Sequence, residues 1–592
     1  MNAFEAVAER SADSYRKLID IGIALSVERD NAKLMERILD EAKHFTCADA
    51  GTLYLNNEDR ELTFQIVRND TLNIALGGTT GATIKFKPVP LVTEAGKPNL
   101  NNVASYSAIT GTVINIADAY SNEDQFDFSG TQRFDASTGY HSKSFLTVPL
   151  KNHEGRVIGV MQLINAKDPE GNVVPFDQTT IPLVEALASQ AAVSIDNRML
   201  IEAQKNLLDS FIELIAAAID AKSPYTGGHC QRVPALTEML TRAVCESQDE
   251  PFKGFNLDEA GWYELHIAGW LHDCGKVTTP EYVVDKATKL ETIYDRIHEV
   301  RMRFEVLKRD AEIAYLKARL DGQDEAKLRQ ALQAELAALD DDFAFIATCN
   351  IGGEFMDPAK VERVKKIAER TWTRTLSDRL GISYAEKTRR EREPERALPC
   401  VEKLLQDRVD HIIERDPVDL MPSDNKWGFK LKMPPAKYNQ GEIYNLSIGR
   451  GTLTEEERYK INDHIMQTIV MLEGLPFPRH LRRVAEYAGG HHEKMDGTGY
   501  PRGRKREDMS IPARVMAIAD IFEALTAADR PYKPAKRLSE AIKIMGFMVK
   551  DKHIDPDLFK LFLKSGVYKQ YAEKFLKPEQ IDEVDLTPYL SA

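Results

Sequence analysis

Several of the 13 histidines of this chain lie in segments whose residue types suit a metal site. Imidazole and carboxylate groups recur there without any thiolate pair. The segments are TGGHCQRV (His229), GWLHDCGK (His272 and Asp273), INDHIMQT (His464), GGHHEKMDGTGYP (His491 and His492) and VMAIADIFEAL (Asp520). Imidazole combined with carboxylate favours iron, manganese or zinc over softer metals.

The adjacent pair His272 and Asp273 indicates a centre with more than one ion. Neighbouring residues on a helix point about 100° apart, so they do not chelate one ion as residues at positions i and i+4 do. They are suited to two ions, with the carboxylate between them. Asp520 lies in an apolar helical segment, where a buried carboxylate needs a metal or a cationic partner. A single buried His–Asp hydrogen bond is common, but five such segments favour a metal centre.

The composition limits the classes of partner. The 592 residues predict several domains, and 43% hydrophobic residues are enough for real cores. The net charge of −14 argues against a nucleic-acid polymer as main partner, because that binding depends on a basic surface. The six cysteines form no CxxC pair, which favours the reducing cytosol. The sequence contains no apolar run of about 18 residues, so no membrane span is predicted. The N-terminal segment has no apolar core of the kind found in signal peptides.

The first 200 residues have the pattern of an α+β module. Helical spacing of apolar residues over 12–45 predicts two helices. Alternating or continuous apolar runs then predict strands, the last two as a hairpin: AGTLYLNN, ELTFQIV, SFLTVPLKN and GRVIGVMQLINAK. A long helix is predicted from Pro182 to Ala221. The remainder is mostly helical, with a helical hairpin predicted over 299–345 and a loop-rich stretch after it.

The first module resembles a GAF domain, a small-ligand sensor fold, over roughly residues 15–200. The likeness is strongest in INIADAYSNEDQFDFSGTQRFDASTGYHSKSFLTVPLKNHEGRVIGVMQLINAK. Of the Asn-Lys-Phe-Asp-Glu signature of cyclic-nucleotide-binding members, Asn165 and Phe176 match, and Lys167 is displaced by one position. The final Asp-Glu pair would fall on Thr180 and Ile181. The resemblance therefore implies either a sensor of a small ligand or a ligand-free structural module. The Leu, Ile and Ala stripe of the following helix suits a signalling linker and a homodimer seam, or packing within its own chain.

The five histidine and aspartate segments resemble, in order, the HD-GYP family of metal-dependent phosphodiesterases. The resemblance covers about 222–295 and 446–550, and HHEKMDGTGYP is nearly the family signature. It implies an all-α domain that hydrolyses cyclic di-GMP to the linear dinucleotide or to GMP with iron or manganese. The implied ligands are His229, His272, Asp273, His464, His491, His492 and Asp520. Three-metal members carry Glu where this chain has Tyr225, so two metals are expected and a third is not.

The family pattern also decides between two histidines. A Leu-Thr-x-x-Glu helix start precedes the middle histidine by eleven residues, counted from the Leu. Eleven residues after Leu453 is His464, whereas His298 lies only eight after Leu290. His464 is therefore assigned as the ligand and His298 as structural. Asp273 and His464 are 191 positions apart, which predicts an insertion between them.

Further roles follow from the same resemblance. Asp273 is the bridging, catalytic carboxylate, and Lys276 is placed to contact a phosphate oxygen during catalysis. Gly499 lies in a loop that a ligand can approach closely. Tyr500 and Pro501 are expected either to shape the guanine pocket or to contact a diguanylate cyclase partner. Arg530 and Lys533 are candidates for guanine or phosphate contacts.

The expected architecture is an α+β GAF domain followed by an all-α HD-GYP domain with a long, partly helical insertion. The expected boundaries are GAF 1–180, linker helix 181–221, HD-GYP 222–298 and 447–592, and insertion 299–446. The expected function is GAF-regulated hydrolysis of cyclic di-GMP. The alternatives are another cyclic dinucleotide such as cyclic GMP-AMP, and a non-catalytic cyclic-dinucleotide receptor or scaffold.

Overall fold

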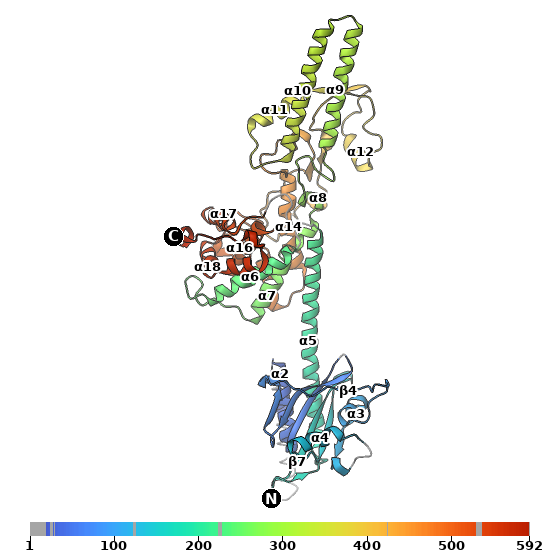
Figure 1. Cartoon of the computed structure of the whole chain (residues 1–592), viewed down its shortest axis with the longest axis vertical. Helices are drawn as coiled ribbons and strands as arrows, with labels where there is room; N and C mark the ends of the chain where they lie inside the picture. Colours follow the sequence, from blue (N-terminus) through green and yellow to red (C-terminus); the bar gives the residue numbers. More distant parts are fainter. Residues whose placement is uncertain are drawn as a thin grey trace. The chain divides into compact units, whose positions relative to one another are not determined.

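The structure, a computed structural model, describes residues 19–23, 28, 30–57, 59–121, 126–222, 228–422, 424–528 and 535–590. The chain divides into two compact units, 1–208 and 209–592, and each is described by itself (Figure 1). Among the described residues, no helix combines the length and the apolar character needed to cross a membrane.

The first unit is built on an antiparallel sheet of eight strands. The order along the sheet is β3 (Ile74–Gly77), β2 (Glu61–Asn69), β1 (Ala48–Asn56), β7 (Val157–Lys167), β6 (Phe145–Lys151) and β5 (Ile114–Ile116). Two short strands, β4 (Val89–Pro90) and β8 (Val173–Val174), pair with β2 and β7. β6 and β7 form the hairpin predicted from the sequence, with Leu146 opposite Leu163.

Helices cover both faces of this sheet. Neighbouring residues of a strand point to opposite faces, so each strand contributes apolar side chains to both sides. Leu53 packs with α2 (Asn31–Thr46) and α5 (Ile181–Lys222), whereas Tyr54 packs on the side of α3 (Val103–Thr110). The first half of α5 contributes six buried residues to the α2 side: Val184, Leu187, Ala188, Ala191, Ala192 and Ile195. The first unit therefore extends past residue 180, and α5 acts as a connecting helix only beyond Ile195.

The first described segments agree with the predicted N-terminal helices only in part. α2 begins at Asn31, where the side chain of Asp30 accepts hydrogen bonds from the amides of Ala32 and Lys33 and caps the helix. Residues 19–23 are helical up to the gap in the described chain. The remainder of the earlier predicted helix, residues 12–18, lies outside the described residues.

The second unit is mainly helical. One core holds the buried faces of α6 (His229–Glu246), α16 (Ile511–Thr526), α17 (Leu538–Lys550), α18 (Pro556–Lys564) and α19 (Val567–Phe575). α7 (Glu259–Leu271), α14 (Glu455–Gly474) and α15 (Val484–Ala488) pack beside these helices, and the short turn η3 (Cys274–Thr278) lies on α14.

The insertion has a core of its own. The predicted helical hairpin is present as α9 (Ile297–Leu320) and α10 (Glu325–Ile351), which pack side by side (Figure 1). α11 (Pro358–Ala368) and α13 (Glu442–Leu446) close this core. The stretch expected to be loop-rich also contains α12 (Tyr384–Arg390) and two small sheets: β9 (Thr371–Arg374) with β10 (Cys400–Lys403), and β11 (Ile412–Ile413) with β12 (Tyr438–Asn439).

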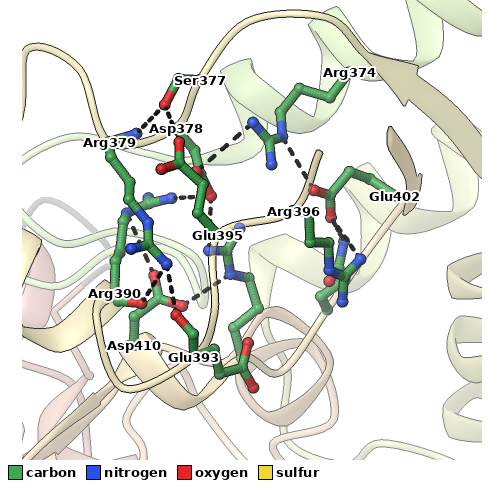
Figure 2. A network of polar contacts seen from close by, with 12 residues as sticks. Arg374, Ser377, Asp378, Arg379, Arg390, Glu393, Glu395, Arg396, Glu402 and Asp410 are labelled. Atoms are coloured by element: carbon green, nitrogen blue, oxygen red, sulfur yellow. Dashed lines mark hydrogen bonds and ion pairs between the residues drawn. The ribbon is translucent and has the colours of Figure 1, made fainter. Parts of the chain in front are cut away.

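A polar network joins these small elements (Figure 2). Asp378 accepts hydrogen bonds from Arg390 at 2.9 Å and Arg408 at 3.0 Å, and Arg374 lies 3.7 Å away. Arg374 also donates to Glu402 at 3.0 Å. Burial raises the pKa of Asp378, but Arg408 and the other guanidinium groups outweigh burial and lower it below its usual value. The network therefore balances its own charges.

The two ends of the insertion meet at the start of α14. The buried Lys286 ammonium lies 2.8 Å from Glu457, which also caps α14 together with Thr454. Lys289 donates to the carbonyl oxygens of Leu446 and Ile448 at 3.0 and 2.9 Å. The chain thus returns to its starting point after the insertion, and α14 is placed beside η3 despite the long separation in sequence.

Candidate metal centre

Two groups of imidazole and carboxylate side chains lie in the second unit. Within each group, one ligand atom per residue lies within 4.8 Å of all the others. The first group is His229, His272, Asp273 and Asp520, and the second is His464, His491 and His492. They come from the start of α6, the junction of α7 and η3, α16, α14 and the turn after α15. The structure therefore brings together all seven residues that the sequence singled out as ligands. The expectation that the neighbours His272 and Asp273 do not face one ion is wrong, because both lie in the first group. His272 caps the C-terminal end of α7 and Asp273 precedes η3, so the two residues do not follow one another on a continuous helix.

Asp273 lies between the two groups. Its Oδ2 is 3.0 Å from His229 Nε2 and 3.2 Å from His272 Nε2, while its Oδ1 is 3.2 Å from His464 Nε2. The side chain is 2% exposed. Each oxygen of this carboxylate thus faces a different group, as a carboxylate shared by two ions requires.

Backbone hydrogen bonds orient three of the imidazoles in the same way. In each, Nδ1 lies within hydrogen-bond distance of the carbonyl three residues earlier: His272 with Gly269 at 2.7 Å, His464 with Ile461 at 2.5 Å, and His491 with Ala488 at 2.7 Å. A carbonyl accepts, so these contacts place the proton on Nδ1 and leave the Nε2 lone pair pointing into the centre.

Two acceptor atoms of the centre lack protein donors. His491 Nε2 and Asp273 Oδ1 are buried without a hydrogen-bond partner. Burial also lowers the pKa of His491 to about 4, so this imidazole is neutral. His464 Nε2 lies 3.1 Å from His492 Nε2. Neutral imidazole nitrogens together with carboxylate oxygens are ligands of divalent metal ions, so the donor set fits such ions.

The ring of His229 is oriented by the ion pair of Glu523 and Arg232, on the side away from the centre. Its Nδ1 lies 2.6 Å from Glu523 Oε2, and Arg232 donates to Glu523 Oε1 at 2.6 Å. Burial disfavours the His229 imidazolium, but Asp273 and Glu523 outweigh burial and raise its pKa to about 9. Burial likewise raises the pKa of Glu523, but His229 and Arg232 outweigh it and lower that pKa to about 2. Glu523 is thus an ionised carboxylate that fixes the ring of His229 and directs Nε2 inward.

Lys276 also points into the centre, with its ammonium 2.5 Å from Asp273 Oδ2. Burial disfavours the charged amine, but Asp273 and Asp520 outweigh burial and raise the pKa of Lys276. The backbone of this turn is held by Lys222, the last residue of α5, which donates to the carbonyls of Lys276 and Val277 at 3.3 and 2.5 Å. A permanent cation therefore lies beside the bridging carboxylate.

Close packing at Gly275 sets the distance between η3 and α14. The Gly275 amide donates to Thr468 Oγ1 at 2.9 Å. A Cβ atom at Gly275 would lie 1.9 Å from the carbonyl oxygen of His464, so only glycine fits. This contact brings Asp273 within reach of His464.

Comparison with known proteins identifies domains in both units. A GAF domain family model matches residues 30–195, and an HD domain family model matches residues 399–558. The chain carries a GAF domain and an HD domain. The HD domain match contains His464, His491, His492 and Asp520, whereas the first three candidate ligands precede it.

Three curated proteins resemble parts of the chain. A 3'3'-cGAMP-specific phosphodiesterase of Vibrio cholerae is 34% identical over 150 residues, which cover 24% of this chain and 33% of that protein. A cyclic di-GMP phosphodiesterase of Pseudomonas aeruginosa is 44% identical over 79 residues, which cover 13% of this chain and 18% of that protein. A cyclic di-GMP phosphodiesterase of Thermotoga maritima is 37% identical over 114 residues, which cover 19% of this chain and 30% of that protein. The chain therefore spans about a third or less of the length of these relatives.

The loop after the histidine pair in the HD domain is packed against its own chain. Tyr500 stacks on His492 with the ring centroids 4.9 Å apart. A Cβ at Gly499 would lie 2.3 Å from the amide nitrogen of Lys494, which explains the glycine. Pro501 is buried, and its carbonyl accepts a 2.6 Å hydrogen bond from the amide of Lys430 in the insertion. The insertion therefore contacts this loop directly.

The remaining predicted residues lie elsewhere. His298 is exposed at the start of α9, where its ring stacks on Tyr294 at 6.5 Å, outside both groups. Arg530, Lys533 and Tyr225 lie outside the described residues. Sequence reasoning missed Glu523, although its position three residues after Asp520 places both carboxylates on one face of α16.

Proposed function

We propose that this chain is a metal-dependent phosphodiesterase that hydrolyses cyclic di-GMP to linear pGpG, GMP or both. The observation that carries the proposal is the position of Asp273, whose two oxygens face two sets of inward-pointing imidazole nitrogens. The names of the relatives support the same class of substrate. The relative from Vibrio cholerae is described as 3'3'-cGAMP-specific, which makes cyclic GMP-AMP the second candidate substrate.

Each side chain of the centre has a defined task in this proposal. The first group would hold one ion and the second group another, with Asp273 shared between them. When bound by these two groups, two divalent ions, iron or manganese, would supply a hydroxide at neutral pH and would polarise the phosphate for in-line displacement. Asp273 remains ionised, because Lys276 and His272 outweigh burial and hold its pKa well below its usual range.

Lys276 has the task of offsetting charge on the phosphate. Its ammonium lies beside Asp273 and keeps its proton, so it donates to a non-bridging phosphate oxygen as negative charge grows there. His272, Asp273 and His491 are almost fully buried, which keeps bulk water away from the reacting groups and strengthens these interactions.

The activity is tested by metal analysis and product chromatography. Protein loaded with iron or manganese under reducing conditions is expected to bind two ions and to hydrolyse cyclic di-GMP. Parallel reactions with 3'3'-cGAMP decide between the two substrates. Tight binding of a cyclic dinucleotide without any hydrolysis would instead make the protein a receptor, and the enzyme proposal would be lost.

Regulation by the GAF domain is proposed to pass through α5. The helix begins in the GAF core and ends at Lys222, whose ammonium donates to the backbone carbonyl of Lys276.

The same helix carries three exposed leucines at intervals of seven residues. They are Leu200, Leu207 and Leu214, which are 55%, 58% and 64% exposed. This spacing is typical of a parallel coiled-coil seam and supports a homodimer. Leu207→Glu is expected to convert the dimer to a monomer in light-scattering measurements.

A further inference from the structure

A cavity of about 240 Å³ lies within the insertion, where its small elements meet. The start of α9, the helix α12 and the strands β9 and β10 contribute to its wall. Part of that wall belongs to the arginine network of Figure 2, including Arg374, Arg390 and Glu402. The described residues that line it include no candidate metal ligand. The cavity is smaller than the roughly 300–1,000 Å³ of sites for drug-sized ligands, so it suits a small group.

The carboxylates on this wall are already paired with arginines. Five carboxylates line the cavity, and each lies within 3.6 Å of a guanidinium group: Glu299 and Glu442 with Arg303, Glu386 with Arg390, Glu402 with Arg374, and Asp410 with Arg408. Lys403, a further cation of the wall, pairs with Glu369 at 2.8 Å. Arg296 and Arg389 also line the cavity, but no carboxylate of the described residues lies within the 4.0 Å of an ion pair with either. Two positive charges on the wall therefore remain unmatched.

Both of these arginines are fixed to neighbouring backbone carbonyls. Arg389 Nε donates to the carbonyl of Asp410 at 3.2 Å, and Arg296 Nη1 donates to the carbonyl of Gln440 at 2.6 Å. The amide of Gln440 donates in turn to the carbonyl of His411, the residue after Asp410, at 2.9 Å. The two guanidinium groups are thus attached to adjoining chain segments on one wall of the cavity.

The wall also has donors that are open to solvent. Nη1 and Nη2 of Arg389 and Nη2 of Arg296 make no hydrogen bond with the described residues, and none of them is among the buried atoms without a partner. The same holds, within the described chain, for the indole N–H of Trp372 on β9. A molecule that enters the cavity therefore meets donors from three side chains.

The pKa values of two arginines on this wall show the missing partner. Burial lowers the pKa of Arg296 below its usual value, although Glu442 opposes the shift. Burial also acts on Arg408, but Asp378 and Asp410 outweigh it and raise that pKa. A guanidinium stays protonated in proteins, so Arg296 keeps a partly desolvated charge whose cost an anion would offset.

We propose that this cavity binds a phosphate group, either as the free ion or as a phosphate monoester. Two guanidinium groups bring two positive charges, and a phosphate monoester carries about −1.5 to −2 at neutral pH. The planar fork of arginine matches pairs of phosphate oxygens. The N–H of Trp372 is a third donor for a remaining oxygen. The insertion thus has an anion site that is distinct from the candidate metal centre.

Calorimetric titration of the full-length protein with inorganic phosphate, at constant ionic strength, tests the site. Arg389→Gln is expected to weaken binding about 10- to 100-fold, because it removes a charged donor. Lys387→Gln is the matched control on α12, since this side chain is 55% exposed and does not line the cavity. It should bind phosphate as the wild type does. Phosphate bound at the metal ions would be the same in both variants, so their difference reports on the cavity.

Further titrations identify the source of the phosphate group. For each ligand, the component that Arg389→Gln weakens is compared. Tighter binding of GMP than of the free ion identifies a nucleotide, and equal affinities identify the phosphate group alone; both results support the site. Guanosine has no phosphate and should show no such component, and a component as strong as that of GMP would contradict the proposal.

Two other results would overturn the assignment. One is equal affinity of Arg389→Gln and Lys387→Gln for phosphate, which includes the absence of binding in all the proteins. The other concerns Arg389→Lys, which keeps the charge and should bind phosphate more tightly than Arg389→Gln. An equal loss in both variants, with faster hydrogen exchange of the β9 and β10 amides, would give Arg389 a structural role. None of these titrations measures hydrolysis, so the inference stands or falls independently of the proposed function.

Discussion

Two polar clusters of the second unit contrast in how their charges are matched. In the insertion, Asp378 accepts hydrogen bonds from Arg390 and Arg408 (Figure 2). In the candidate metal centre, Asp273 Oδ1 is buried and accepts no hydrogen bond, and His491 Nε2 has no partner. The first cluster pairs its donors with acceptors. The second leaves these two acceptors unpaired, although Lys276 and His229 lie within hydrogen-bond distance of the other oxygen of Asp273.

The contrast separates a structural cluster from a chemical one. A cluster whose charges match is stable as it stands and fixes the elements that carry it. Buried acceptors that lack a donor are costly, and a bound metal ion would offset that cost. The hydrogen bonds from Nδ1 of His272, His464 and His491 to backbone carbonyls therefore matter for ligand binding. They hold each N–H donor away from the centre and keep the Nε2 acceptor facing it.

The largest effect is expected for the carboxylate that faces both groups. Asp273→Ala should abolish turnover and lower the content of bound metal, because both groups lose a shared ligand. Asp378→Ala, which removes the central carboxylate of the insertion network, should leave turnover unchanged. Activity assays and metal analysis of both variants provide the measurement; full turnover in Asp273→Ala would refute the bridging role.

The next largest effect is expected for His464, and it should be absent for His298, the other histidine considered for the same ligand position. His464→Ala should cost most of the activity and one of the two ions, since its Nε2 faces Asp273 at 3.2 Å. His298→Ala should retain wild-type turnover, because this ring is exposed on α9. Equal losses in both variants would show that the spacing argument chose wrongly.

A smaller effect, on metal affinity, is expected when Glu523, the carboxylate that contacts Nδ1 of His229, is replaced. Glu523→Gln keeps the shape of the side chain but removes the charge that fixes the His229 ring. Metal affinity should fall about 10- to 100-fold, as for other supporting partners of ligating histidines. A metal titration against a competing chelator measures the change. Gln580→Leu serves as a control, because this buried amide donates to the carbonyls of Thr526 and Lys536 rather than to a candidate ligand.

The sequence predicted more of the residues in the candidate metal centre than of the residues that surround them. All seven candidate ligands lie in short motifs that keep their order on both sides of the insertion, and His464 was chosen over His298 by counting from Leu453. Glu523 was missed because one glutamate on an amphipathic helix carries no signal of its own. Its position relative to Asp520 becomes informative only once that aspartate is known to face the site.

The fold was predicted where patterns are long. The β6–β7 hairpin, the α9–α10 hairpin and the long helix α5 were all expected and are present. The four-residue strands β9 and β10 were not predicted, because they are short and their stability depends on Arg374 and Glu402 side chains from facing strands. The packing of the first half of α5 into the GAF core was one of two alternatives that the sequence left open, since a helix with many apolar residues suits either a core or a linker.

The insertion network is expected to affect local stability rather than chemistry. Asp378→Ala leaves Arg390 and Arg408 without their shared acceptor, and hydrogen bonds to charged groups contribute about 1.5–3 kcal/mol each. Hydrogen exchange of the β9 and β10 amides should therefore speed up by the equivalent of about 2 kcal/mol. Amides of α6 in the other core serve as the internal reference. Unchanged exchange in β9 and β10 would mean that this network does not stabilise the insertion.

The smallest expected effect is a dependence of insertion stability on pH through His411. Burial lowers the pKa of this imidazole below its usual 6.5, although Glu442 and Asp410 oppose the shift. Its Nδ1 accepts a hydrogen bond from the amide of Arg408 at 3.2 Å, so the neutral ring is the form that fits. The unfolded chain takes up the proton first as the pH falls. The free energy of unfolding therefore falls below about pH 6.5, by at most about 1.4 kcal/mol per pH unit, and becomes constant below the folded pKa.

His411→Asn keeps a side-chain acceptor but does not titrate, so it isolates this contribution. Hydrogen exchange of the β9 and β10 amides, corrected for the intrinsic dependence on pH, is compared between pH 7.5 and 5.5 in both proteins. The wild type should lose more protection than the variant over this range. An identical loss in the two proteins would assign the dependence to other groups, and the Arg408–His411 contact would then be no more sensitive to pH than its neighbours in the network.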